Sequence, residues 1–220
     1  REVLLPMQRG TASSIRNRLG RDAVRSFVGG DLIDVRQSEA DIIAKKLHEW
    51  INSIESSAEF MRGMTGDKDQ KSLSFGVISF YKAQVFAVYE ALKQYGITER
   101  AQDGTWQIAQ KYRFLEDGEE RLRIGTVDAF QGMEFDVVFL SMVRSQDMKA
   151  LPHHICNEKD YKKKQQKIFG HLMSENRLCV SMSRQKKVLA IVGDGVLANT
   201  NIAVDAVPAL KNFYDLCHEQ

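Results

Sequence analysis

Two segments in the second half of the chain hold polar residues whose types and spacing suit phosphate chemistry. In the first, Gln131-Gly132 forms a tight turn between two apolar runs, and Glu134 follows almost at once. Glycine lets a backbone amide approach a ligand closely. A carboxylate at the same edge can hydrogen-bond a ribose hydroxyl or position a phosphate-bound group. An ordinary strand–turn–strand corner has the same composition, so both interpretations stay open at this point.

The second segment carries arginines in a stretch with helical spacing. Arg177 and Arg184 are seven residues apart and are expected near one face of a helix. A guanidinium group keeps its charge and presents a planar fork of donors that suits phosphate oxygens. Two arginines on a helix are more often a solvated face, but a helix that leads directly into an apolar strand favours a site.

A strand-then-helix rhythm surrounds both segments and would position them. We expect strands at 32–35, 75–79, 122–127, 136–142 and 188–193, with a short helical turn at 129–131. Helices are expected after an N-cap at Ser38, and over 83–95, about 174–185 and from Pro208 onward. Strands that are apolar throughout and alternate with helices indicate an α/β fold, with a mostly parallel sheet covered on both faces. Such sheets bind ligands at the carboxyl ends of their strands, so we expect both segments at that edge.

The remaining stretches lack clear periodicity. Residues 1–30 are rich in arginine and are interpreted as a linker or lead-in segment, and 31–220 as one domain. Residues 55–72 are expected to form a loop, 97–120 to be irregular, and 146–168 to form a polar insertion. Because the chain begins with Arg1 rather than Met, we expect it to be a fragment of a longer protein.

Composition indicates a globular α/β domain. Of 220 residues, 43% are hydrophobic and 27% charged, and no apolar run approaches the roughly 20 residues of a membrane span. We therefore expect no membrane partner. The cysteines, Cys156, Cys179 and Cys217, are widely spaced and favour a reducing intracellular location, cytoplasmic or nuclear. A net charge of +2 neither requires nor excludes nucleic acid, because a groove needs only local basic charge.

Together the two segments resemble motifs V and VI of superfamily I helicases, in the branch that includes the nonsense-mediated-decay helicase. They read TVDAFQGMEFDVVFLSMVRS from Thr126 and NRLCVSMSRQKK from Asn176. Residues 75–84 are similar to motif IV, and 169–172 fit the segment before motif VI. The resemblance spans roughly residues 30–218 and implies the second RecA-like motor domain of such a helicase, a RecA-like three-layer sandwich.

The resemblance also implies roles for individual residues. Arg184 falls on the arginine finger, the catalytic residue that reaches the γ-phosphate of ATP across the cleft between two RecA-like domains. Such a finger contributes roughly 10³–10⁵ in rate. Gln131, Gly132 and Glu134 fall on the ATP-binding edge of motif V. Ser79, Tyr81 and Thr126 fall where the family contacts the nucleic-acid backbone. Two further residues are expected to bind nucleic acid: Asp128, one turn on, as a link between the two ligands, and Arg144, after the motif V strand, as a phosphate contact.

Some positions depart from the family pattern. Ser79-Phe80 stands where the family usually has Thr-Pro, and Ser181-Met182-Ser183 where it has Ala-Leu-Thr. Asn176-Arg177 replaces a pair of arginines, which removes one potential partner for a phosphate or a carboxylate. The hydroxyl of motif IV and the arginine of motif VI are both retained.

A phosphate-binding loop is missing from the sequence. No G-x-x-x-x-G-K-[ST] pattern occurs, and no apolar strand ends in Asp-Glu to hold Mg²⁺. The resemblance therefore implies that ATP and Mg²⁺ bind mainly to a first RecA-like domain of the same polypeptide. The expected function is the C-terminal motor domain of an ATP-dependent helicase or translocase on single-stranded DNA or RNA. By itself this fragment should not hydrolyse ATP.

Two other functions remain open. The chain could be a non-catalytic nucleic-acid-binding or scaffold module with a RecA-like fold, or a small nucleotide-binding α/β protein acting alone, which the missing loop argues against. Lys162-Lys163-Lys164 with Lys167 is interpreted as a solvated loop, with phosphate contact as the alternative. No metal site is predicted, because His153-His154 and Cys156 lack a matching ligand pair. Packing rather than base stacking is expected of the large aromatics Trp50, Trp106 and Phe114.

Overall fold

A five-stranded sheet lies at the centre of the molecule. The computed structural model describes residues 3–6, 35–57, 72–144 and 158–218. The strand order is β1-β7-β6-β2-β5, and every neighbouring pair is parallel. The strands are Val3–Pro6 (β1), Phe75–Ser79 (β2), Leu122–Thr126 (β5), Phe135–Ser141 (β6) and Gln185–Gly193 (β7).

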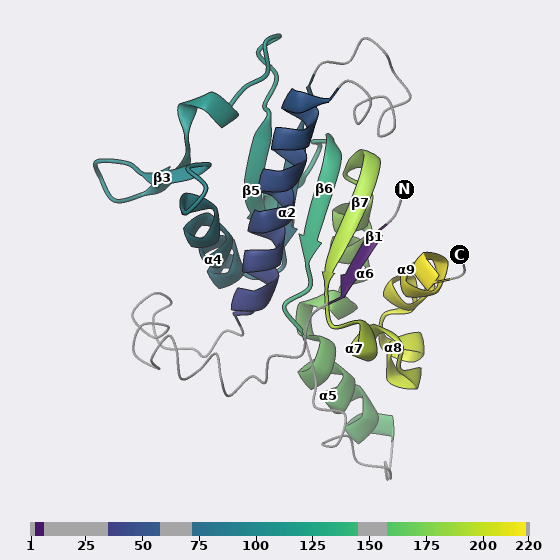
Figure 1. Cartoon of the computed structure of the whole chain (residues 1–220). Helices are drawn as coiled ribbons and strands as arrows, with labels where there is room; N and C mark the ends of the chain where they lie inside the picture. Colours follow the sequence, from purple (N-terminus) through teal and green to yellow (C-terminus); the bar gives the residue numbers. More distant parts are fainter. Residues whose placement is uncertain (1–2, 7–34, 58–71, 145–157, 219–220) are drawn as a thin grey trace.

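Helices cover both faces of this sheet (Figure 1). Helices α2 (Gln37–Ser56) and α4 (Lys82–Lys93) pack on one face, and α6 (Glu175–Met182) lies behind the other. Side chains of β6 alternate between the two layers: Val137 and Phe139 join the cluster with α2 and α4, whereas Val138 and Leu140 join the cluster that contains α6. All of β6 is buried, as expected for a parallel strand between two helical layers. The predicted α/β three-layer sandwich is confirmed.

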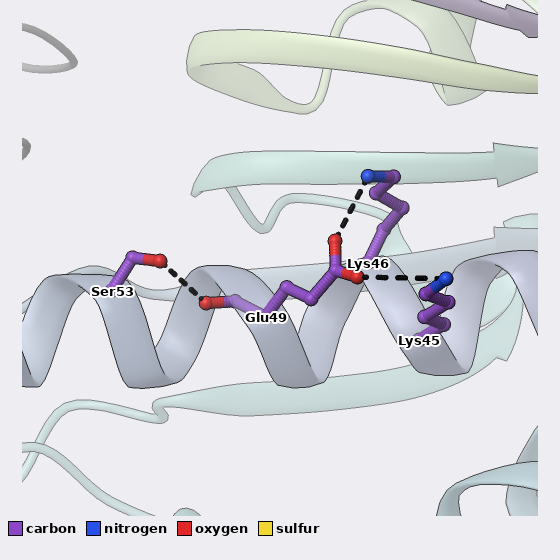
Figure 2. Close-up of polar contacts among 4 residues, drawn as sticks. All are labelled: Lys45, Lys46, Glu49 and Ser53. Atoms are coloured by element: carbon purple, nitrogen blue, oxygen red, sulfur yellow. Dashed lines mark hydrogen bonds and ion pairs between the residues drawn. The ribbon is translucent and has the colours of Figure 1, made fainter.

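Helix α2 shows how the sequence orients a helix against the sheet. Ile43, Leu47 and Ile51 recur at helical spacing and are buried, whereas Glu49 lies on the outer face. Figure 2 shows the Glu49 carboxylate between two lysines, with Lys46 Nζ at 2.8 Å and Lys45 Nζ at 3.9 Å. The hydrogen bond from Lys46 is the main reason that the pKa of Glu49 is lowered. This outer face is an ordinary solvated one.

Shorter elements complete the described chain. A hairpin of β3 (Thr98–Arg100) and β4 (Trp106–Ile108) is followed by the 3₁₀ turn η1 (Gln110–Tyr112). The turn η2 (Val127–Phe130) follows β5, and α5 (Glu158–Phe169) runs into η4 (Gly170–Met173) before α6. After β7 come α7 (Gly195–Ala198), α8 (Asn201–Ala206) and α9 (Pro208–His218).

The predicted strands at 75–79, 122–127, 136–142 and 188–193 are confirmed as β2, β5, β6 and β7, as is the helix that begins at Pro208. Two predictions are wrong in part: 97–120, predicted to be irregular, contains the β3–β4 hairpin, and the described end of the polar insertion forms α5. Strand β1 lies in the predicted lead-in, where a four-residue strand is too short to show periodicity. The predicted strand at 32–35 lies almost wholly outside the described residues, as do 7–30 of the lead-in, so the domain boundary stays a prediction.

The N-cap predicted at Ser38 is wrong, because α2 begins two residues earlier, after Arg36. The backbone of Arg36 is paired with the Gln84 side chain of α4, which donates to Arg36 O at 3.0 Å and accepts from Arg36 N at 2.9 Å. This long-range pair replaces a local cap. No helix within the described ranges has the length and hydropathy needed to cross a membrane.

Candidate functional site

The predicted nucleotide residues lie at the amino ends of the strands. Phe135 and Gln185, which begin β6 and β7, are register partners, and Phe135 N donates to Arg184 O at 2.9 Å. Glu134 and Arg184 therefore enter the sheet side by side at this amino edge. The expectation that both motif segments lie at the carboxyl ends of the strands is wrong for these residues.

The path of the chain between parallel strands places residues 131–134 at the amino edge. After Thr126 ends β5, the chain must return to the opposite edge before β6 can run in the same direction. Turn η2 makes this return, so residues 131–134 arrive at the amino edge. Ser79, Thr126 and Arg144 each end or follow a strand and lie at the carboxyl edge. The site residues thus divide into two groups at opposite edges.

At the amino edge, Arg184 is bonded to the turn that contains the other predicted nucleotide residues. Its Nη1 donates to Met133 O at 3.3 Å, its Nε donates to Val180 O at 3.0 Å, and its Nη2 donates to Ser183 Oγ at 3.0 Å. The side chain is half-buried, and within the described ranges no carboxylate lies within ion-pair distance of it. All three acceptors are neutral.

Helix α6 ends at Met182, so Arg184 lies beyond it. The prediction that Arg184 shares a helix face with Arg177 is therefore wrong. Ser183 leaves the helical conformation, with φ −119° and ψ 13°, and Arg184 lies in the connection to β7. The backbone bond from Phe135 draws this connection into the sheet, which overrides the helical spacing. Arg177 stays on α6 and forms an ion pair with Asp128 of η2 at 3.2 Å.

The turn at 131–134 is exposed and depends on glycine. Gly132 has φ +76°, a conformation that strains other residues. Met133 N donates to Phe130 O at 3.1 Å and closes the turn. The side chains of Gln131 and Glu134 are exposed on either side. The structure therefore brings together the four predicted nucleotide residues, with two polar side chains and one guanidinium around an open turn.

At the carboxyl edge, Tyr81 and Arg144 are bonded to each other. Arg144 Nε donates to the Tyr81 hydroxyl at 2.6 Å, and Arg144 Nη1 donates to Lys167 O at 3.4 Å. Gly170 makes this packing possible, because an added Cβ would clash with Arg144 Nη2 and lie 2.8 Å from the Tyr81 hydroxyl oxygen. Gly170 also has φ +53°. The sequence identifies residues 169–172 only as the segment before motif VI. In the structure they are part of the carboxyl edge.

The other residues predicted to bind nucleic acid differ in exposure. Ser79 is only 1% exposed, and its hydroxyl accepts from Tyr81 N at 3.3 Å, so it shapes the end of β2 rather than facing solvent. Thr126 is half-buried at the end of β5. Asp128 is exposed and paired with Arg177, which joins η2 to α6. Nucleic-acid contact by these residues stays a prediction.

A buried carboxylate that sequence reasoning missed lies beneath the carboxyl edge. Glu39 of α2 is fully buried, and its Oε2 accepts from Ser141 Oγ at 2.6 Å and from Val143 N at 2.9 Å. Arg36 Nε donates to Val143 O at 3.0 Å. Among the described residues, Val143 is the one non-glycine with a positive φ, at +65°, and it directly precedes Arg144. The start of α2 thus holds Val143 in its strained conformation, and Val143 determines where the chain places Arg144.

Burial raises the pKa of Glu39 to about 7, against the lowering effects of Ser141, Val143 N and Arg36. Its Oε1 has no hydrogen-bond partner. A signal for this residue was available, because Glu39, Ile43 and Leu47 repeat at four-residue spacing on the apolar face of α2. An acidic side chain on an apolar helix face marks a buried polar contact. No cluster of metal-ligating side chains occurs in the described part of the chain, and His153, His154 and Cys156 lie outside it.

Similarity to known proteins agrees with the motif segments. The helicase required for RNAi-mediated heterochromatin assembly 1 of Schizosaccharomyces pombe is 33% identical over 148 residues, which cover 61% of this chain and 13% of that protein. DNA polymerase alpha-associated DNA helicase A of Saccharomyces cerevisiae is 31% identical over 170 residues, or 75% of this chain and 18% of that protein. The chain therefore spans less than a fifth of either relative.

Among solved structures, the C-terminal domain of a possible DNA helicase from Lactobacillus plantarum WCFS1 matches 82% of this chain and 84% of its own, at 19% identity. Its TM-score of 0.37 is too low to support conclusions about the site. A family model described as AAA domain matches residues 25–196, which include both edges of the sheet described above. The chain belongs to this AAA domain family and, with its helicase relatives, to superfamily I helicases.

Proposed function

We propose that this chain is the second RecA-like motor domain of an ATP-dependent helicase or translocase that acts on single-stranded DNA or RNA. The observation that carries the proposal is the amino edge, where Arg184 is bonded to an exposed turn with Gln131 and Glu134 beside it. These groups offer donors and a carboxylate to a nucleotide but no loop to cradle its phosphates. A first RecA-like domain of the same polypeptide is the proposed source of that loop.

The bonding of Arg184 suits a group that changes partners. Its donors are engaged by two backbone carbonyls and a hydroxyl, all neutral. A phosphate oxygen offers a charge-assisted hydrogen bond, which is roughly twice as strong as a neutral one. Arg184 therefore gains by turning to the γ-phosphate, where it neutralises charge that develops during transfer. Mg²⁺ would be held mainly by the first domain and would supply charge neutralisation for the phosphates.

The carboxyl edge is proposed to bind the strand. Tyr81, Thr126 and Arg144 lie there, and Arg144 supplies a guanidinium that suits backbone phosphates. Binding of this kind is independent of sequence and weakens with salt. Turn η2 begins at the carboxyl edge and leads to the turn at the amino edge, so it is a direct link between strand and nucleotide. The ion pair of Asp128 with Arg177 ties this link to α6.

Substitution of Arg184 in the full-length protein tests the proposal. Arg184→Ala should lower the nucleic-acid-stimulated ATPase rate by roughly 10³-fold or more. Binding of a single-stranded oligonucleotide should be unchanged, because Arg184 lies at the opposite edge. Arg113→Ala is the matched control, since Arg113 is an exposed arginine before β5.

Full ATPase activity in Arg184→Ala would show that the assigned mechanism is wrong. A wild-type protein that binds single strands but hydrolyses no ATP would instead support the non-catalytic binding module. These two outcomes are distinct, because the first is a property of the variant and the second of the wild type.

A further inference from the structure

Helix α5 is anchored to the domain by one face. Gln165, Ile168 and Phe169 are buried, and the Tyr161 hydroxyl donates to Asp205 Oδ2 of α8 at 2.6 Å. Figure 1 shows α5 on the side of the sheet where the strands end. The orientation of this helix is therefore determined by packing, unlike the solvated loop predicted from the sequence.

The opposite face of α5 carries a line of lysines, which we call the lysine stripe: Lys159, Lys163 and Lys167. All three are exposed, and they follow one another at four-residue spacing along one side of the helix. Successive members are separated by about 6 Å along the helix axis. At 100° per residue, the stripe is centred roughly opposite Tyr161, Gln165 and Ile168, the anchored face.

No ion pair to the lysine stripe occurs within the described part of the chain. Two acidic residues adjoin it: Glu158 pairs with Lys162 at 2.8 Å, and Asp160 lies between Lys159 and Lys163 in the sequence without an ion pair to any stripe lysine. Like charges at four-residue spacing destabilise a helix by about 0.2–0.5 kcal/mol per pair. A linear anion along the stripe would remove this repulsion.

The stripe is continuous with the carboxyl edge. Arg144 Nη1 donates to the backbone oxygen of Lys167, so the inner end of the stripe adjoins the guanidinium proposed to contact the strand. The same guanidinium reaches the Tyr81 hydroxyl. Basic groups therefore extend from the end of β6 outward along α5 in one direction.

We propose that the lysine stripe binds the sugar–phosphate backbone of the single strand beyond Arg144, and so extends the strand-binding edge onto α5. This inference rests on the proposed function. Lysine suits the role, because its compact charge on a flexible stem follows a backbone without requiring one geometry. The regular spacing and the junction with Arg144 favour a continuous polyanion over an isolated acidic side chain.

The test replaces all three lysines with glutamine, a good helix former, as K159Q/K163Q/K167Q in the full-length protein. The affinity for a single-stranded oligonucleotide is measured from 50 mM to 500 mM salt. Each lost phosphate contact should lower the slope of log K against log salt by about 0.7, or about 2 for the triple variant. At 50 mM salt the affinity should fall by about 10- to 100-fold.

The matched control is K45Q/K93Q/K111Q, which removes the same charge from exposed lysines on α2, α4 and η1. Its slope should stay close to that of the wild type. Circular dichroism should show unchanged folding of the stripe variant, and each single substitution should lower the slope by about 0.7 if the triple variant proves unstable.

Equal slopes for the stripe variant and the control would overturn the proposal. Loss of binding to polyglutamate with an unchanged strand slope would also overturn it, and would assign the stripe to an acidic protein partner. Failure of the proposed function has a different signature: the wild type would then show no stimulated ATPase, or Arg184→Ala would show no defect. Equal slopes together with an intact Arg184 effect therefore reject the stripe alone.

Discussion

The two edges of the sheet are built differently. At the carboxyl edge, Arg144 is bonded to Tyr81, and Glu39 holds Val143, so polar groups from α2, β6 and the residues after β2 interlock. At the amino edge, Arg184 contacts neutral acceptors, while Gln131 and Glu134 are exposed. One edge is a network of buried polar groups, whereas the other presents an arginine bonded to neutral acceptors beside two exposed polar side chains.

Because of this difference, we expect substitutions at the two edges to affect stability and activity differently. Substitutions at the carboxyl edge break a buried network, so they should reduce the free energy of unfolding as well as strand binding. Substitutions at the amino edge remove groups that we propose act on ATP, so under this proposal they should reduce ATPase activity with little loss of stability. Four measurements test this contrast.

The largest stability effect is expected at Glu39 and depends on pH. Its folded pKa of about 7 lies above the ordinary value of 4.5, so between these two pH values the folded chain binds more protons than the unfolded chain. The free energy of unfolding should therefore fall as pH rises from 4.5 to 7, by up to about 3 kcal/mol, and then level off.

Glu39→Gln removes this titration, so the difference between variant and wild type isolates it. Urea denaturation at pH 4.5 and pH 8 should show the variant gaining stability relative to the wild type at the higher pH. Glu39→Ala is the control, because it leaves Val143 N without its acceptor and should be less stable than the glutamine variant. Parallel pH profiles for wild type and Glu39→Gln would contradict the assignment.

Gly170→Ala should have the next largest effect. The new Cβ meets the Arg144 guanidinium and the Tyr81 hydroxyl, and the positive φ adds backbone strain, for a total of about 2 kcal/mol. Gly96→Ala is a matched control, because Gly96 has φ +67° but nothing within 4 Å of an added Cβ. Thermal unfolding of both variants separates contact from strain. Equal losses would mean that the interlocked carboxyl edge contributes nothing at this position.

Arg184→Ala should lower stability by about 1 kcal/mol at most, since it removes hydrogen bonds from a half-buried side chain to neutral acceptors. The same variant is expected to lose most of its ATPase activity. A loss of several kcal/mol in a denaturation experiment would mean that Arg184 is mainly structural, and the contrast between the edges would not hold.

The smallest effect is expected for the ion pair between Asp128 and Arg177, whose side chains are 68% and 41% exposed. A double-mutant cycle with alanine should give a coupling of about 0.5 kcal/mol, which decreases in high salt. A coupling above 2 kcal/mol would indicate that η2 and α6 are joined more firmly than their exposure suggests. The coupling free energy is measured by denaturing the wild type, the two single variants and the double variant at two salt concentrations.

Much of this molecule could be predicted from local patterns in the sequence. Apolar runs such as 137–140 predicted the buried strands, because a strand covered on both faces is mostly apolar. Helical spacing predicted α4 and α9, and Pro208 marked the start of the latter. The motif segments identified Gln131, Gly132, Glu134 and Arg184 as a group, and the fold brings them together.

Tertiary structure alone decided which edge each group occupies and which polar residues are buried together. The amino-edge position of 131–134 follows from the return path between parallel strands, which no residue type encodes. Glu39 meets Ser141 across 102 positions of sequence, a distance at which periodicity carries no information. Local patterns determine which face of an element is apolar, whereas the packing of those faces determines which distant polar groups must share one buried space.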